Sequence, residues 1–204
     1  MTKILTVFGA TGQQGGSLID YVLKNPELSS LYHLRGITRD ASKASATSLK
    51  ERGVQVIQAD LSDSQSLVSA VADSYAVFGV TNCMSLLRLI AFLLANNSIP
   101  DWDKGSAAIE IAQGKAIADA ALAASVTLLI WSSLPNVSRM TRGALTDVAH
   151  FDSKAEVEEY IRNLPILSSF FMAGWYMQNH ISYMRPKLVS LFPYMNKSCI
   201  MKLM

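Results

Sequence analysis

The sequence of 204 residues lacks the features that mark several classes of protein. Its two cysteines, Cys83 and Cys199, form no close pair and no metal-ligand spacing, so we expect neither a disulfide scaffold nor a metal site. The net charge of +2 is too small to indicate direct binding of nucleic acid. An apolar block after Cys83 is interrupted by Arg88 and is shorter than the roughly 20 residues of a membrane span, so no membrane partner is expected.

A targeting peptide is also not expected. Met1, Thr2 and Lys3 run directly into an apolar strand, and the scarcity of cysteine fits a reducing compartment. We expect the cytoplasm, with the nucleus as a further location. Half of the residues are hydrophobic and 17% are charged, so the chain can bury a sizeable core. We therefore expect a single domain over residues 1–204.

What the sequence does contain is a glycine-rich segment near its N-terminus. It consists of Gly9, Ala10, Thr11, Gly12, Gln13, Gln14, Gly15 and Gly16. An apolar run at 4–8 precedes it, and apolar residues at helical spacing follow at 17–23, which is the context of a dinucleotide-binding loop. Gly9 would make the turn, Gly12 would admit a pyrophosphate, and Gly15 would let the helix pack close to the strand. Because the first gap is one residue longer than in the common fingerprint, a flexible turn is the alternative.

Strand-like and helix-like segments alternate along the rest of the chain. The expected strands are 4–8, 33–38, 54–58, 75–80, 126–131 and 164–172. The expected helices are 17–23, 44–52, 64–71, 106–125 and 150–162. This alternation predicts an α/β fold with a doubly wound parallel sheet.

Ligands of such sheets bind beyond the carboxyl ends of the strands. Asp60 and Leu61 follow the third strand, and Thr81 and Asn82 follow the fourth. These four residues are candidates for contacts with adenine and ribose. Ordinary turn chemistry is the alternative.

The end of the second strand bears on the choice of cofactor. An NAD site usually has a carboxylate there, whereas Arg39 can pair with a 2′-phosphate and Lys43 can add a second positive charge. Asp40 lies close enough to obscure the distinction. We predict NADP(H) in preference to NAD(H), with Arg39, Asp40, Ser42 and Lys43 at the site. A solvated basic loop is the alternative.

The assembled motifs resemble the NmrA-like family, an atypical branch of the short-chain dehydrogenases. The matching segments are Gly9 to Gly16, Thr38-Arg39, Val80-Thr81-Asn82, Trp102 to Gly105, Gln113-Gly114-Lys115, His150 to Tyr160 and Tyr176 to Asn179. The resemblance covers the chain apart from 83–100 and the last few residues. It implies a Rossmann-type sheet with helices on both faces. Because family members continue into a smaller subdomain, it also implies that the chain is truncated and that this subdomain is largely missing.

The resemblance also assigns roles to residues. It implies that Gly9 to Gln14 hold the phosphates and that Arg39 and Lys43 lie near the 2′-phosphate. Asp60 and Leu61 would flank the adenine, and Thr81 and Asn82 would lie along the cofactor. Lys154 would reach the nicotinamide ribose. The residues implied to line the nicotinamide end are Tyr176, Met177, Gln178 and Asn179.

Active short-chain dehydrogenases use a Tyr-x-x-x-Lys pair to exchange a proton with the substrate. Here His150 stands at the tyrosine position before Lys154, and Ser132 or Ser133 stands at the place of the helper serine. His150 can shuttle a proton and Lys154 can act as a base. The alternative is that Lys154 only orients the ribose and His150 only packs.

These expectations leave three functions open. The first is a cofactor sensor, in which NADP(H) occupancy regulates a protein partner, as in family members that control transcription. The second is an NADPH-dependent reductase of a small carbonyl or conjugated substrate. The third is a non-functional truncated product.

Residues 83–100 form an atypical insert, which we interpret as a translated intron. In the family, Thr-Asn is followed at once by an aromatic residue and tryptophan, whereas here residues 83–101 separate Asn82 from Trp102. Cys-Met can be encoded with the common fungal splice donor GTATG, and Pro-Asp with the acceptor CAG. Excision would restore Thr-Asn-Tyr-Trp in frame. The alternative is an extra helix that covers the site.

Overall fold

The computed structural model describes residues 2–81, 102–174, 176 and 177. The chain divides into two compact units, Met1–Ala173 and Gly174–Met204. The fold below is that of the first unit. The insert at 83–100 lies outside the described residues, so both interpretations of it stay predictions, as does the expectation of a single domain.

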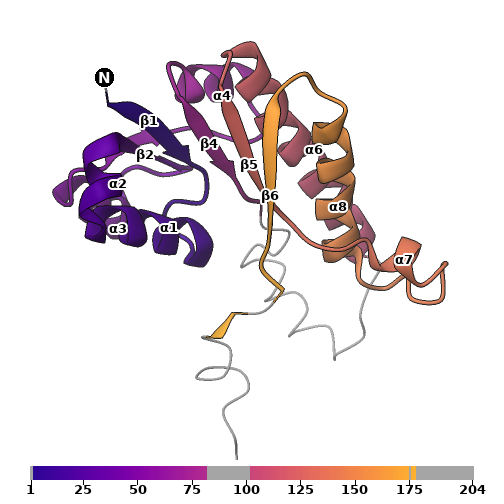
Figure 1. The fold of residues 1–204 in the computed structure, drawn as a ribbon. Helices are drawn as coiled ribbons and strands as arrows, with labels where there is room; N and C mark the ends of the chain where they lie inside the picture. Colours follow the sequence, from indigo (N-terminus) through magenta and orange to yellow (C-terminus); the bar gives the residue numbers. More distant parts are fainter. Residues whose placement is uncertain (1, 82–101, 175, 178–204) are drawn as a thin grey trace, which may run out of the picture. The chain divides into compact units, whose positions relative to one another are not determined.

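A parallel sheet forms the centre of this unit (Figure 1). Its strands are β1 (Lys3–Val7), β2 (Tyr32–Thr38), β3 (Gln55–Gln58), β4 (Ala76–Gly79), β5 (Leu128–Ser133) and β6 (Leu167–Met172). They lie in the order β3-β2-β1-β4-β5-β6, and every pairing is parallel. The predicted doubly wound α/β sheet is therefore confirmed. The chain changes direction between β1 and β4, which is where such sheets bind ligands.

Helices cover both faces of the sheet (Figure 1). They are α1 (Gln13–Lys24), α2 (Pro26–Leu31), α3 (Ala44–Glu51), α4 (Ser64–Val71), α6 (Trp102–Ala123), α7 (Val137–Met140) and α8 (Ala149–Arg162). On one face, Ile19 of α1 and Leu49 of α3 belong to a buried apolar cluster. On the other, Leu67 of α4, Ile117 of α6 and Ile161 of α8 belong to a second cluster. The right-handed crossover of parallel strands explains this division, because connections that run in opposite directions along the sheet place their helices on opposite faces.

The sequence predicts that Ile109, Ala112, Ala116, Ile117 and Ala120 form the buried face of α6, and this is confirmed for Ile117 and Ala120 but not for Ile109 and Ala112. Ile109 and Ala112 are exposed, whereas Glu110, Gly114 and Ile117 are buried. A Cβ atom added at Gly114 would lie 2.6 Å from Cγ2 of Val157 and 2.9 Å from the Trp131 ring. The missing side chain thus lets α6 approach both β5 and α8. Packing space, rather than apolar periodicity, decides which face of α6 is buried.

The loop after β5 contains the short helix α7, which the sequence did not predict. The Asp152 carboxylate accepts hydrogen bonds from the backbone N–H of Val137 at 2.6 Å and of Ser138 at 3.2 Å. It also accepts one from the Ser138 hydroxyl. In α8, whose N-cap is Val148, the first turn contains Asp152. Its carboxylate instead satisfies the first N–H groups of a neighbouring helix.

In the described residues, no helix combines the length and apolar character needed to cross a membrane. The same residues contain no group of three or more histidine, cysteine, aspartate or glutamate side chains placed to hold a metal ion. The expected cytoplasmic or nuclear location stays a prediction.

Candidate site at the carboxyl ends of the strands

The glycine-rich loop makes a tight turn directly after β1. Gly9 has a φ of 62°, which favours glycine, and the N–H of Gly12 donates to the Gly9 carbonyl at 2.8 Å. A Cβ added at Gly15 would lie 2.4 Å from that carbonyl oxygen. Only glycine therefore lets α1 start so close to the strand. These roles of Gly9 and Gly15 in the turn are as the sequence predicted.

The start of α1 is open to solvent. Thr11, Gly12 and Gln13 are exposed, while Ala10 and Gly15 are buried. Gly12 is the N-cap of α1, and the first turn contains no acidic residue. A helix start of this kind attracts anions, because its N–H groups and dipole carry partial positive charge.

The segment after β2 folds into a turn that uses the carboxylate of Asp40. One of its oxygens accepts from the Ser42 N–H at 2.9 Å and from the Ser42 hydroxyl at 2.6 Å. These bonds lower the pKa of Asp40, and the charge of Lys43 adds to the effect. The side chains of Arg39 and Lys43 are exposed. The acidic group is thus engaged within its own turn, whereas the basic groups face solvent.

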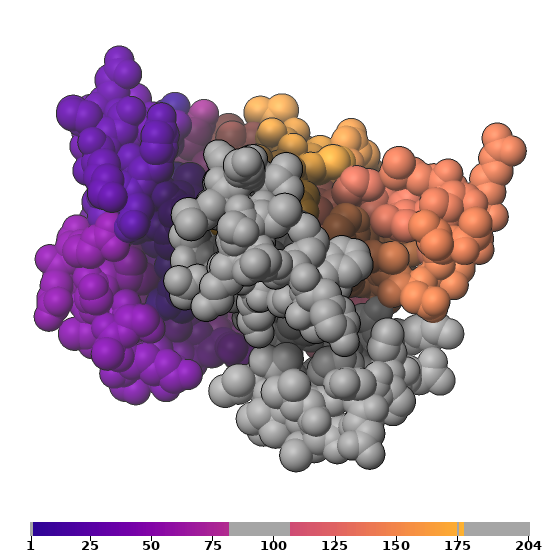
Figure 2. Space-filling view, turned by 90° about the horizontal axis from the view of Figure 1, so that it is seen from below, coloured from indigo at the N-terminus to yellow at the C-terminus, as the bar shows by residue number. Residues whose placement is uncertain are grey.

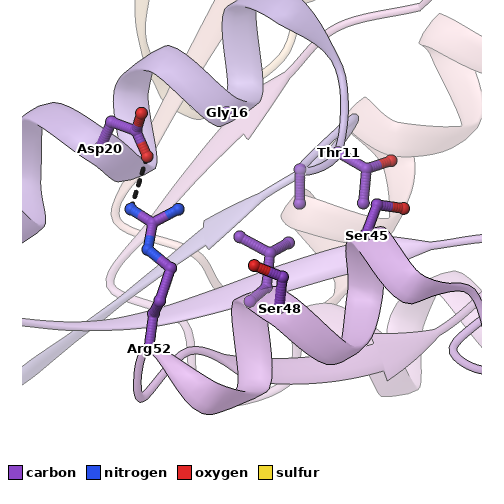
Figure 3. A pocket seen from close by; sticks show the side chains of 8 residues that line it. Thr11, Gly16, Asp20, Ser45, Ser48 and Arg52 are labelled. Atoms are coloured by element: carbon purple, nitrogen blue, oxygen red, sulfur yellow. Dashed lines mark hydrogen bonds and ion pairs between the residues drawn. The ribbon is translucent and has the colours of Figure 1, made fainter.

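A pocket of about 260 Å³ lies between the glycine-rich loop, α1 and α3 (Figure 3). Arg52 points across it toward Asp20 of α1, at 2.5 Å between Nη2 and Oδ1. Its lining residues are Ala10, Thr11, Gly16, Asp20, Ser45, Ser48, Leu49 and Arg52. Of these, the sequence analysis had assigned only Ala10 and Thr11 to a site. The spacing of Ser45 and Ser48, three residues apart on a helix, was the available signal.

Asp60 and Leu61 follow β3, as predicted. The Asp60 carboxylate accepts from the Ser62 N–H at 2.9 Å, and Leu61 packs against the apolar core beneath the sheet. The alternative expected for this segment, ordinary turn chemistry, is therefore present. A cofactor contact by either residue stays a prediction.

Lys154 lies in a buried polar cluster at the end of β4. Its Nζ donates to Oε1 of Glu110 at 2.5 Å, to the Thr81 carbonyl at 2.9 Å and to Oγ1 of Thr81 at 3.3 Å. The Thr81 hydroxyl donates to the same Glu110 oxygen at 2.9 Å, and the Ser153 hydroxyl donates to the other at 2.5 Å. The Glu110 side chain has no exposed surface, and that of Lys154 is 12% exposed. The three N–H groups of Lys154 thus have internal acceptors.

Sequence reasoning missed Glu110. The sequence feature that could have revealed it is helical spacing: Glu110 lies on the same face of α6 as Gly114, Ile117 and Ala121, all of which are buried. A charge at such a position requires a partner, because burial of an unpaired charge is costly.

The other candidates for proton transfer lie in different surroundings. His150 is exposed, and its ring meets that of Phe151 edge-on with centroids 4.9 Å apart. Ser132 and Ser133 are both 1% exposed, and the Ser133 hydroxyl donates to the Leu134 carbonyl at 3.4 Å. Tyr160, further along α8, donates to Asp119 at 2.6 Å, and this bond raises the pKa of its phenol.

The space-filling view looks at the face toward which the arrowheads of β1 and β4 point in Figure 1 (Figure 2). The N-terminal elements, indigo to magenta, lie on one side of this view. The segment around α7, in orange, lies on the other.

Five of the predicted site residues are not placed by this geometry. Tyr176 and Met177 belong to the second unit, and Asn82, Gln178 and Asn179 lie outside the described residues. Their roles stay predictions.

A model of the NmrA-like family matches residues 1–191 of this sequence. The chain belongs to the NmrA-like family. The resemblance predicted from the motifs is thereby confirmed.

The similar proteins of this family include oxidoreductases and a regulator. The NmrA-like oxidoreductase lnaB of Aspergillus flavus is 30% identical over 94% of this chain and 52% of its own length. The oxidoreductase cpsB of Aspergillus campestris is 34% identical over 86% of this chain and 47% of its own. Among solved structures, the negative transcriptional regulator NmrA has a TM-score of 0.65 and 25% identity, with 88% of this chain and 48% of that chain covered. The chain thus spans about half the length of the NmrA-like relatives it matches.

Proposed function

We propose that this NmrA-like chain binds NADP(H) in preference to NAD(H) and acts as a cofactor sensor that regulates a protein partner. One observation carries the sensor role. Lys154 donates to Glu110 and Thr81, and the exposed His150 stands where active short-chain dehydrogenases have the catalytic tyrosine.

Dinucleotide binding is supported by the glycine-rich loop at the point where the sheet reverses its winding. The exposed start of α1 offers backbone N–H groups to a pyrophosphate. A structure of the NmrA regulator is described as a complex with NAD, at 25% identity to this chain. The dinucleotide would therefore lie across the carboxyl ends of β1 and β4, with its phosphates at the loop.

The preference for NADP(H) is supported by the turn after β2. A carboxylate that selects NAD accepts hydrogen bonds from the ribose 2′-hydroxyl, but Oδ1 of Asp40 already accepts two from Ser42, so only its other oxygen could make that contact. Arg39 and Lys43 are exposed beside it and supply the charge that a 2′-phosphate needs.

The sensor role follows from the chemistry that hydride transfer to a carbonyl requires. A proton must reach the substrate oxygen from a positioned acid. The Lys154 N–H groups are engaged with Glu110 and Thr81, and the Tyr160 hydroxyl donates to Asp119, so neither side chain is placed to give this proton. Regulation needs only that the partner bind the NADP(H)-loaded and empty forms with different affinities.

A reductase is the second candidate, and the relatives favour it. The curated relatives lnaB and cpsB are both named oxidoreductases. In this case His150 would supply the proton, and the substrate would be a small carbonyl or conjugated compound.

Two measurements on the same preparation separate the candidates. NADPH fluorescence reports binding, and absorbance at the nicotinamide band reports oxidation in the presence of a panel of carbonyls and quinones. The sensor account predicts saturable binding with no substrate-dependent oxidation above the buffer rate. Oxidation that is present in the unmodified protein and abolished by His150→Ala would instead establish the reductase.

A further inference from the structure

A fully buried carboxylate lies close to the cofactor site without being part of any motif. Glu110 of α6 has no exposed side-chain surface, and both of its oxygens accept hydrogen bonds. Because burying a carboxylate costs several kcal/mol unless it is paired, this arrangement needs a reason.

The partners of Glu110 join three segments that are distant in sequence. Thr81 follows β4, Ser153 and Lys154 belong to the first turns of α8, and Glu110 itself lies on α6. The carboxylate and the Thr81 carbonyl hold the Lys154 ammonium from two directions. The ammonium is thereby fixed at the carboxyl end of β4, the ligand side of such a sheet.

Packing of the two helices does not require this ion pair. Gly114 of α6 lies directly against Val157 of α8 and the Trp131 ring, and all three residues are buried. The Trp131 indole also donates to the Lys154 carbonyl at 3.1 Å. Apolar side chains of similar volume often serve stability as well as a buried ion pair does, so a charged pair here indicates a task other than packing.

We propose that Glu110 is a positioning residue of the cofactor site, which holds the Lys154 ammonium where the nicotinamide ribose lies. This inference rests on the proposed function. The 3.3 Å bond from Lys154 to the Thr81 hydroxyl is the longest of the three and is the one exchanged for a ribose hydroxyl. The 2.5 Å bond to Glu110 is kept, so the lysine stays ordered before and after binding.

Two ligands test this role on the Glu110→Gln variant. NADPH reaches the nicotinamide end, whereas adenosine 2′,5′-bisphosphate carries the adenosine and the 2′-phosphate but no nicotinamide ribose. We expect Glu110→Gln to weaken NADPH binding about tenfold, since a charged hydrogen bond is misplaced, and to leave the bisphosphate affinity unchanged. A purely structural role would weaken both ligands alike.

Glu156→Gln is the matched control. Glu156 also lies on α8 and pairs with a lysine of α6, Lys115, at 3.2 Å, but this pair is exposed. The control variant should bind both ligands as the unmodified protein does.

If Glu110→Gln is unfolded by circular dichroism, Ser153→Ala decides. It removes the donor to the second Glu110 oxygen, and we expect a smaller loss, about two- to fivefold, for NADPH alone. Equal weakening of both ligands, or no change in either, overturns the proposal. If the unmodified protein binds NADPH but Glu110→Gln weakens both ligands alike, only this inference fails. If the unmodified protein does not bind NADPH, the proposed function fails as well.

Discussion

We expect single charged side chains to decide which cofactor the turn after β2 accepts. Arg39 and Lys43 are exposed at this turn, and the carboxylate between them is engaged with Ser42. We expect Arg39→Ala to weaken NADPH binding about tenfold or more, because a charge-assisted contact with the 2′-phosphate is lost. NADH affinity should stay the same, which equilibrium fluorescence titration of both cofactors checks. A variant that loses both affinities equally would place Arg39 outside the 2′-phosphate site.

The pKa of Asp40 makes a prediction about pH. The Ser42 hydroxyl and N–H, and then the Lys43 charge, lower this pKa. Stability from the ionised carboxylate is therefore complete above the ordinary aspartate pKa of about 3.9 and is lost as the pH falls through the lowered value. Between pH 5.5 and 8, the ratio of NADPH to NADH affinity should show the same pH dependence in the unmodified protein and in Asp40→Asn. A difference between the two profiles in this window would mean that Asp40 titrates there.

Lys154 and His150 share a helix but differ in burial, and this difference predicts their effects. Lys154→Met leaves Glu110 buried without its cation, which should cost about 3–5 kcal/mol of stability and weaken NADPH binding. His150→Ala removes only an exposed ring contact with Phe151, so binding and unfolding should change little. Urea unfolding and NADPH titration of both variants give the comparison. A larger binding loss in His150→Ala would reverse the assignment of roles.

At the scale of the element, the first turn of α1 contains two adjacent glycines, and the space around them differs. A Cβ at Gly15 would lie 2.4 Å from a backbone oxygen, whereas a Cβ at Gly16 would lie 3.6 Å from its nearest neighbour. Gly15→Ala should therefore cost about 1–3 kcal/mol of stability and disrupt cofactor binding by moving the helix.

The matched variant Gly16→Ala should be neutral or stabilising by up to about 1 kcal/mol, because alanine favours the helix. Thermal unfolding and NADPH titration distinguish the two. Equal effects of the two substitutions would mean that α1 does not need its close approach to β1.

The elements themselves could largely be predicted from the sequence, and their exceptions have identifiable causes. Apart from α2, which was not predicted, and α7, the strands and helices fall close to their expected positions because apolar runs alternate with helical spacing and Gly53 ends α3 at a φ of 84°. Helix α7 was missed because its first N–H groups depend on Asp152, which is distant in sequence. The buried face of α6 was predicted only in part, because Gly114 and Trp131 meet only in the folded chain.

In the candidate site, the glycine-rich loop could be predicted from the sequence, whereas the cluster around Lys154 could be predicted only in part. The glycine-rich loop is local, so its spacing alone indicated the turn that Gly9 and Gly15 make. The cluster around Lys154 joins β4, α6 and α8, and Glu110 entered it without any motif. A contact of this kind depends on tertiary packing, which local spacing does not report.

At the scale of the whole molecule, the chain forms the parallel sheet in the order β3-β2-β1-β4-β5-β6, with the change of direction between β1 and β4. It does so with about half the length of its curated relatives. The elements that would hold the adenosine half of a dinucleotide all belong to the unit Met1–Ala173. We therefore expect this unit to bind the cofactor whether or not it reduces a substrate.

Calorimetric titration of the unmodified protein with NADPH and with NADH, under identical conditions, tests this claim most directly. The account predicts one saturable site that binds NADPH about tenfold or more tightly than NADH, because the exposed Arg39 and Lys43 would pair with a 2′-phosphate. Equal affinities, or the absence of binding to either cofactor, would contradict it.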